Sequence, residues 1–159
     1  RDIDAYPLDL NEQIKTALQD IYSSVNCDGI RIELKLGIEQ PKVKCGNKLR
    51  RVFYDLIKNG IEAIKKKPGV VEIITCRTDS GVQVEVSDNG SGIPQEFLEH
   101  VFEDWFFTSK DTESNVGRGL GLYWIKRFLN AYGADIIISS QIGFGTTLKV
   151  IFYRVSEVN

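Results

Sequence analysis

The chain has 159 residues, of which 42% are apolar and 26% are charged, and it contains 14 glycines against only four prolines. This length and composition predict a single globular domain with its own core, and they exclude a disordered chain, a collagen-like chain and a small disulfide-stapled scaffold. Twenty Lys and Arg against 22 Asp and Glu give a net charge of −2. Because no overall positive field results, we expect no nucleic acid partner.

The charges are unevenly distributed along the chain. Residues 42–67 hold nine Lys and Arg, whereas residues 88–113 hold seven acids against a single Lys. Two solvated faces account for this pattern, and the basic segment supports anion binding only if a phosphate site lies beside it. Three widely spaced cysteines fit neither a metal pattern nor a disulfide framework, so we expect reduced thiols in a reducing compartment. They are Cys27, Cys45 and Cys76.

Two features concern the longer protein from which the chain would come. The sequence begins at Arg1 and contains no Met, which indicates a piece of a longer chain. It shows neither a signal peptide pattern nor an apolar run long enough to span a membrane. We therefore expect a cytoplasmic domain without direct membrane contact, and leave open whether the parent protein is anchored to a membrane.

The spacing of apolar residues predicts an alternation of helices and strands. In chain order it predicts a helix over 11–25 capped by Asp9 or Asn11, strands over 30–36 and 42–45, a helix over 47–66, a hairpin of strands at 70–77 and 82–87, a short helix near 94–100, a helix over 118–132 ending at Gly133, and a second hairpin of strands at 135–139 and 146–155. This order predicts an α/β fold, a two-layer sandwich with a mixed, mostly antiparallel sheet and helices on one face.

The first candidate site is the segment 88–94, Asp-Asn-Gly-Ser-Gly-Ile-Pro, at the end of an alternating strand. The Asp88 carboxylate can accept a hydrogen bond from an amino group such as that of adenine, whereas guanine presents a carbonyl at the same position. The neighbouring glycines let the backbone approach a flat ligand closely. A plain Asx turn, common in Asp-Asn-Gly sequences, is the alternative interpretation.

The second candidate site is the glycine-rich run 115–122, which leads into a predicted helix. Free N–H groups and the positive end of the dipole at a helix N-terminus form a cradle for phosphate. The G-x-G-x-G spacing is neither a Rossmann fingerprint nor a Walker loop. A glycine-rich hinge is the alternative interpretation.

The third candidate site lies on the helix predicted over 47–66. Asp55, Asn59 and Glu62 stand about one turn apart and share one flank of that helix. A carboxylate and a carboxamide there can hold Mg²⁺ and orient a water or a hydroxyl group. The alternative is a solvated flank, which we favour for Glu62.

Together these segments resemble, in order, the motifs of the nucleotide-binding domain shared by gyrase, the large ATP-dependent chaperone, mismatch-repair ATPases and histidine kinases. The helix over 47–64 resembles the N-box, residues 88–94 the G1 box, and residues 117–122 the G2 box. Residues 101–110, Val-Phe-Glu-Asp-Trp-Phe-Phe-Thr-Ser-Lys, resemble the F-box of histidine kinases, and 143–147 resemble the last glycine-threonine motif. The resemblance runs from about Leu8 to Tyr153 and implies the Bergerat-type ATP-binding fold.

The resemblance also implies a role for individual residues. Asn59 would bind Mg²⁺, Asp88 and Gly92 would contact adenine, Thr146 would support the adenine site through water, and Lys110 would reach the phosphates cradled by Gly117, Gly119 and Gly121. The nucleotide-binding set would further include Gly90, Ile93, Phe107, Arg118, Leu120 and Leu122. Asp55, Asn59 and Lys110 would be the catalytic residues, and 104–117 would form a mobile ATP lid.

Two positions depart from the histidine kinase pattern. Asp55 replaces the first Asn of the N-box, at a place where gyrase and chaperone relatives carry an acidic base. Asp55 would therefore act either as a general base or as an orienter of a metal-bound water. Gly60 stands where Ala is usual, which would weaken the helix by about 1 kcal/mol and let the backbone approach a ligand.

His100 is the only histidine, and it precedes the F-box, where this family carries no phosphoacceptor. The resemblance therefore implies the ATP-binding catalytic domain of a sensor histidine kinase, formed by residues 1–159, which donates the γ-phosphate of MgATP to a histidine on an upstream dimerisation domain. A response regulator receiver domain would be a further partner, and the full-length protein a homodimer. The alternatives are an ATP-hydrolysing or serine/threonine-phosphorylating relative of the same fold, and a non-catalytic nucleotide-sensing domain.

Overall fold

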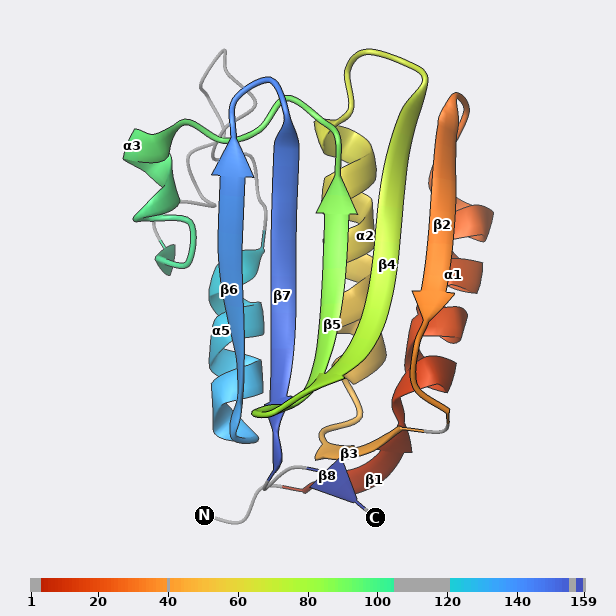
Figure 1. Ribbon diagram of the computed structural model, residues 1–159, viewed down its shortest axis with the longest axis vertical. Helices are drawn as coiled ribbons and strands as arrows, with labels where there is room; N and C mark the ends of the chain where they lie inside the picture. The colour runs from red at the N-terminus through yellow and green to blue at the C-terminus, as the bar shows by residue number, and fades with distance from the viewer. Residues whose placement is uncertain (1–3, 40, 105–120, 155–156, 159) are drawn as a thin grey trace.

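Five strands form the main sheet in the computed structural model, which describes residues 4–39, 41–104, 121–154 and 157–158 (Figure 1). Their spatial order is β2 (Ile30–Leu36), β4 (Gly69–Thr78), β5 (Gly81–Asp88), β7 (Gly145–Tyr153) and β6 (Ala134–Gln141). β2 runs parallel to β4, and the other three pairs are antiparallel. The predicted mixed, mostly antiparallel sheet is thereby confirmed.

Helices cover one face of this sheet, as Figure 1 shows. They are α1 (Leu10–Ser24), α2 (Leu49–Ala63) and α5 (Leu122–Ala131), and a short α3 (Gln95–Leu98) lies beyond the β6 edge. The predicted cap of the first helix is Asp9, whose Oδ1 accepts a hydrogen bond from the Glu12 amide at 3.1 Å. In the part of the chain that the structure describes, no helix is both long and apolar enough to cross a membrane.

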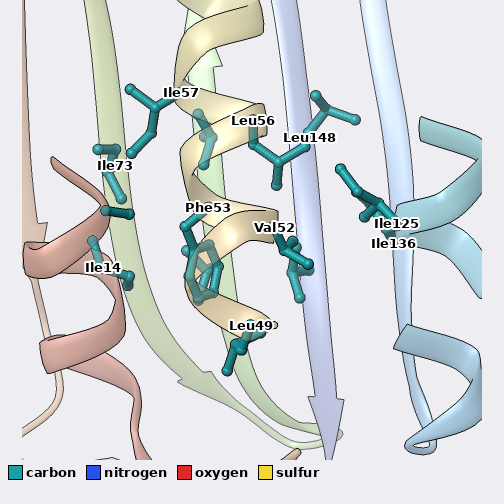
Figure 2. Close-up of a cluster of buried hydrophobic side chains, with 14 of the residues drawn as sticks. Ile14, Leu49, Val52, Phe53, Leu56, Ile57, Ile73, Ile125, Ile136 and Leu148 are labelled. Atoms are coloured by element: carbon teal, nitrogen blue, oxygen red, sulfur yellow. The ribbon is translucent and has the colours of Figure 1, made fainter. Parts of the chain in front are cut away.

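The core lies between the helices and the sheet, and α2 stands at its centre. Figure 2 shows Val52, Phe53 and Leu56 of α2 directed toward the strands, with Ile125 of α5 close to the β6 strand. The three α2 side chains have no solvent exposure because the apolar stripe predicted along 47–66 faces the sheet. The two-layer α/β sandwich predicted from the order of elements is confirmed.

A second sheet, which has three strands, did not follow from the sequence. It lies near the two ends of the chain (Figure 1). It consists of β1 (Tyr6–Asp9), β3 (Lys42–Cys45) and β8 (Glu157–Val158), all paired antiparallel in the order β1-β3-β8. β3 was expected as a short strand, but its partners have only four and two residues. Segments this short carry no readable alternation.

The second helix ends earlier than the predicted boundary at 66. α2 stops at Ala63, and Ile64 turns into an extended conformation that buries its side chain to 5% exposure. The Ala63 carbonyl, which a continuing helix would use internally, accepts a hydrogen bond from the Ser91 amide at 3.0 Å. The loop after β5 is therefore tied to the end of α2.

Candidate functional site

A cavity of about 650 Å³ lies between the second half of α2 and the ends of β5 and β7. Its volume is in the range of small-molecule sites. Among the candidate residues that the structure describes, it is lined by Asn59, Asp88, Gly92, Ile93, Leu122 and Thr146. Three segments that the sequence singled out separately thus meet at one cavity.

Asp88 is the last residue of β5 and pairs across the ladder with Thr146 of β7. Burial raises the pKa of its carboxyl from 3.8 to about 6, although hydrogen bonds from the backbone amides of Gly90 and Thr146 oppose the shift. The Gly90 amide donates to Oδ1 at 2.8 Å, which is the Asx-type contact considered from the sequence. The turn and a ligand-facing carboxylate are therefore compatible, because the same side chain makes the turn and lines the cavity.

Ser140 links two residues of the cavity wall, Ile93 and Thr146, to the backbone of Gly145, although the sequence did not single it out. Its Oγ accepts from the Ile93 amide at 2.8 Å and donates to the Gly145 carbonyl at 3.0 Å. Since a serine hydroxyl has one hydrogen, the 2.7 Å contact with Thr146 Oγ1 then requires the threonine to donate. This leaves Thr146 Oγ1 as a hydrogen-bond acceptor. A pattern in the sequence could have marked Ser140. It is a polar residue at the position that continues the inward-facing series of Ala134, Ile136 and Ile138.

The backbone at Gly92 fits closely against the hairpin between β6 and β7. Its φ is +78°, and a Cβ placed there would collide with the Gln141 carbonyl oxygen. The Gly143 amide donates to the Ser91 carbonyl at 2.9 Å. Only glycine satisfies both the conformation and the close approach, which accounts for the second glycine of the 88–94 segment.

On α2, Asn59 and Asp55 occupy different surroundings. Asn59 lines the cavity, whereas Asp55 is not among its described lining residues. The Asp55 carboxylate is only 16% exposed, accepts from Arg51 Nε at 2.9 Å and accepts from Trp124 Nε1 of α5 at 3.1 Å. Glu62 lines the cavity but is exposed, as expected of a solvated flank. Asp55 is thus bound within the protein rather than solvated.

The remaining candidate residues fall into two groups. Gly90 packs on the end of α2, where an added Cβ would stand 2.5 Å from the Ala63 carbonyl oxygen, and Gly121 is the N-cap of α5. The others lie outside the described residues, as does the proposed lid 104–117 apart from Asp104. They are Phe107, Lys110, Gly117, Arg118, Gly119 and Leu120.

His100 follows α3 in a turn rather than standing on a helix. Its Nδ1 lies 3.2 Å from Glu103 Oε2. Next to it, Val101 is buried and the Phe102 ring carries Lys126 Nζ at 5.0 Å from its centroid. The start of the segment 101–110 is therefore packed against α5.

Residues 46–156 match the family described as histidine kinase-, DNA gyrase B-, and HSP90-like ATPase. Sporulation kinase D of Bacillus subtilis (strain 168) is 36% identical over 143 residues, which are 89% of this chain but 27% of that protein. The chain thus spans about a quarter of the length of this relative.

Solved structures share the fold. The nucleotide-free catalytic domain of histidine kinase ThkA superposes with a TM-score of 0.79 at 21% identity, covering 96% of this chain and 97% of that one. ThkA in complex with the response regulator protein TrrA gives a TM-score of 0.73 at 20% identity, covering 94% and 42%. The resemblance to ATP-binding domains of sensor histidine kinases is confirmed: the chain belongs to the family of histidine kinase-, DNA gyrase B- and HSP90-like ATPases.

Proposed function

We propose that the chain is the catalytic domain of a sensor histidine kinase, which binds MgATP and donates the γ-phosphate to a histidine on a separate dimerisation domain. Asp88 carries the proposal for adenine. It is a half-buried carboxylate at a strand end that lines a cavity of nucleotide size. Such a group favours a ligand with an amino group and disfavours one with a carbonyl in the same place.

Asn59 supports the metal part of the proposal. A carboxamide oxygen is the hard ligand that Mg²⁺ accepts, and Asn59 lies in the cavity wall. Mg²⁺ commonly binds through a few protein oxygens together with substrate phosphates, so one such residue suits a metal that arrives with the nucleotide. When bound, the ion would neutralise charge developing on the phosphates during transfer.

The protein's own contribution would be positioning. Asp88 would hold the base, and Thr146, with its hydroxyl hydrogen directed to Ser140, would accept a hydrogen bond at the same end of the cavity. Leu122 at the start of α5 would bring the helix N-terminus toward the phosphates. Phosphoryl transfer needs little more from the protein than this placement and charge neutralisation.

The partners belong to the same proposal. Relatives named as sporulation and sensor kinases, and the ThkA complex with a response regulator, support a histidine-bearing domain and a receiver domain as partners. A homodimeric, cytoplasmic parent protein is part of the same proposal. The non-catalytic alternative and the hydrolase or serine/threonine kinase alternative remain distinguishable by what happens to the γ-phosphate.

A binding and transfer experiment tests the proposal. Calorimetry with ATP, with and without Mg²⁺, should show binding, and a histidine-bearing dimerisation domain from a related kinase should then gain acid-labile phosphate. Binding without any transfer or hydrolysis would support the nucleotide-sensing alternative. Release of free phosphate without labelling of the histidine domain would support the hydrolase.

A further inference from the structure

Asp55 of α2 and Trp124 of α5 form a polar contact between two helices of one layer. Trp124 Nε1 donates to Asp55 Oδ2 at 3.1 Å, and Arg51 Nε donates to Asp55 Oδ1 at 2.9 Å. Each carboxylate oxygen thus already accepts a hydrogen bond, and the side chain is only 16% exposed. A carboxylate held by two such hydrogen bonds is fixed in orientation.

The contact touches the residue from which α5 begins. Gly121 is the N-cap of α5, with a φ of +69°. A Cβ built on Gly121 would stand 3.5 Å from Trp124 Nε1 and 3.8 Å from Asp55 Oδ2. A methyl group at that position would be in van der Waals contact with both partners, so the pair borders the start of α5. Leu122, immediately after Gly121, lines the cavity.

We propose that Asp55 and Trp124 together are positioning residues that hold the N-terminus of α5 against α2 and thereby set the affinity for the phosphates of the nucleotide. This inference rests on the proposed function. Neither side chain needs to touch the nucleotide, since the N–H groups at the start of α5 would make the contact and the pair would fix their direction. The role differs from general base catalysis by Asp55, which requires a free lone pair aimed at the reacting group.

The position of the Asp55–Trp124 pair predicts which part of the nucleotide would be bound more weakly if the pair were removed. The Asp88 end of the cavity is formed by β5, β7 and the segment 88–93. Among the described residues, none of these elements is hydrogen-bonded to Asp55 or Trp124. Loss of the pair should therefore weaken ATP binding while leaving adenosine binding unchanged. A purely structural contact would instead lower both affinities together, through loss of folded protein.

Two conservative variants and one matched control test this. Trp124→Phe keeps a ring that can pack on Phe128, whose centroid lies 5.8 Å from that of Trp124, but removes the N–H donor. Asp55→Asn keeps the size of the side chain but faces an amide group toward one of the two N–H donors. Tyr123→Phe is the control, since it removes the hydroxyl that binds Arg127 on the exposed side of the same helix.

Calorimetry should show about five- to tenfold weaker ATP binding for each of the two variants, with adenosine affinity within twofold of the unmutated chain. The double variant should bind ATP about as weakly as the weaker of the two single variants, because both substitutions act on the same contact. Tyr123→Phe should bind both ligands normally. Full ATP affinity in both single variants, or an equal loss for ATP and adenosine, would overturn the inference.

A spectroscopic measurement without nucleotide checks the contact itself. The indole N–H resonance of Trp124, identified by its disappearance in Trp124→Phe, should shift when Asp55 becomes Asn and stay in place in Tyr123→Phe. An unmoved resonance in Asp55→Asn would overturn the inference. If the unmutated chain bound neither ATP nor adenosine, the proposed function would fall and this inference with it, whereas normal binding with unaffected variants would overturn the inference alone.

Discussion

Burial in the folded protein raises the pKa of the Asp88 carboxyl group above that of an ordinary aspartate. An acid whose pKa is raised to about 6 is partly protonated in weak acid, where an ordinary Asp is ionised. The ionised carboxylate is a stronger acceptor for an adenine amino group than the protonated acid is. Adenosine affinity should therefore increase as the pH rises through 6, and be about tenfold lower at pH 5 than at pH 7.5.

Adenosine is the suitable probe because it carries no phosphate that titrates in the same range. Titration calorimetry at several pH values would measure the effect, and Asp88→Asn should give a weak, pH-independent affinity as the control. A flat profile in the unmutated chain would show that the ionised carboxylate is not the acceptor.

The raised pKa of Asp88 also makes the folding stability depend on pH. Because the folded protein binds this proton more tightly than the unfolded chain, the contribution of Asp88 to stability decreases as the pH rises from about 4 through about 6. The loss amounts to at most about 3 kcal/mol. As the pH rises from 4.5 to 7.5, the free energy of unfolding of Asp88→Asn should therefore increase relative to that of the unmutated chain. Urea unfolding at the two pH values would measure this difference.

Gly60 illustrates how the structure refines a residue that the sequence had marked as unusual. A Cβ there would meet Val71 Cγ2 at 3.4 Å and Asp88 Cβ at 3.5 Å, which are ordinary contacts. Gly60→Ala should therefore add about 1 kcal/mol to the free energy of unfolding through helix propensity. Gly90→Ala is the contrasting variant, since its Cβ would press on the Ala63 carbonyl. Chemical denaturation should separate them, and a destabilised Gly60→Ala would contradict the prediction.

At the scale of elements, the long periodic segments were predictable and the short ones were not. α2 followed from its apolar stripe, and β5 from the alternation of Val82, Val84 and Val86. The end of α2 did not, because the Ser91 amide that takes the Ala63 carbonyl comes from a loop almost thirty residues further along the chain. Local propensity carries no information on a partner so distant in sequence.

The candidate site was also only partly predictable, because some of its residues lie in local sequence patterns and others act through contacts between distant residues. Asp88, Asn59 and Thr146 belong to short patterns that each indicate a chemistry, and the fold brings them to one cavity. Ser140 and Trp124 act through tertiary contacts, so no pattern of neighbours marks them strongly. Trp124, one of the two partners of Asp55, lies 69 residues away and could not be predicted from the helix that carries the aspartate.

Ser140 at the end of β6 gives a prediction about how two elements are held together. Ser140→Ala removes the acceptor for the Ile93 amide and the partner that orients Thr146, leaving a donor in the cavity wall unpaired. This should cost about 1–3 kcal/mol of stability and also weaken adenosine binding. Ser139→Ala is the matched control, since that neighbouring side chain is exposed. Equal melting temperatures and affinities for the two variants would contradict the prediction.

At the scale of the whole molecule, the chain should bind ATP yet not phosphorylate itself. His100, the only histidine, lies in a turn after α3 beside Glu103, and is not presented from a helix. A phosphoacceptor has to reach the γ-phosphate in line with its leaving group, which a second, mobile domain can do and a side chain fixed beside a carboxylate cannot.

Incubation with γ-labelled ATP and Mg²⁺ should therefore leave the isolated chain unlabelled under alkaline conditions that preserve phosphohistidine. A supplied histidine-bearing domain should become labelled in the same tube, and His100→Ala should transfer to it at an unchanged rate. Acid-labile phosphate on His100, or loss of transfer in His100→Ala, would mean that the acceptor lies within this domain and that its kinase chemistry needs no partner.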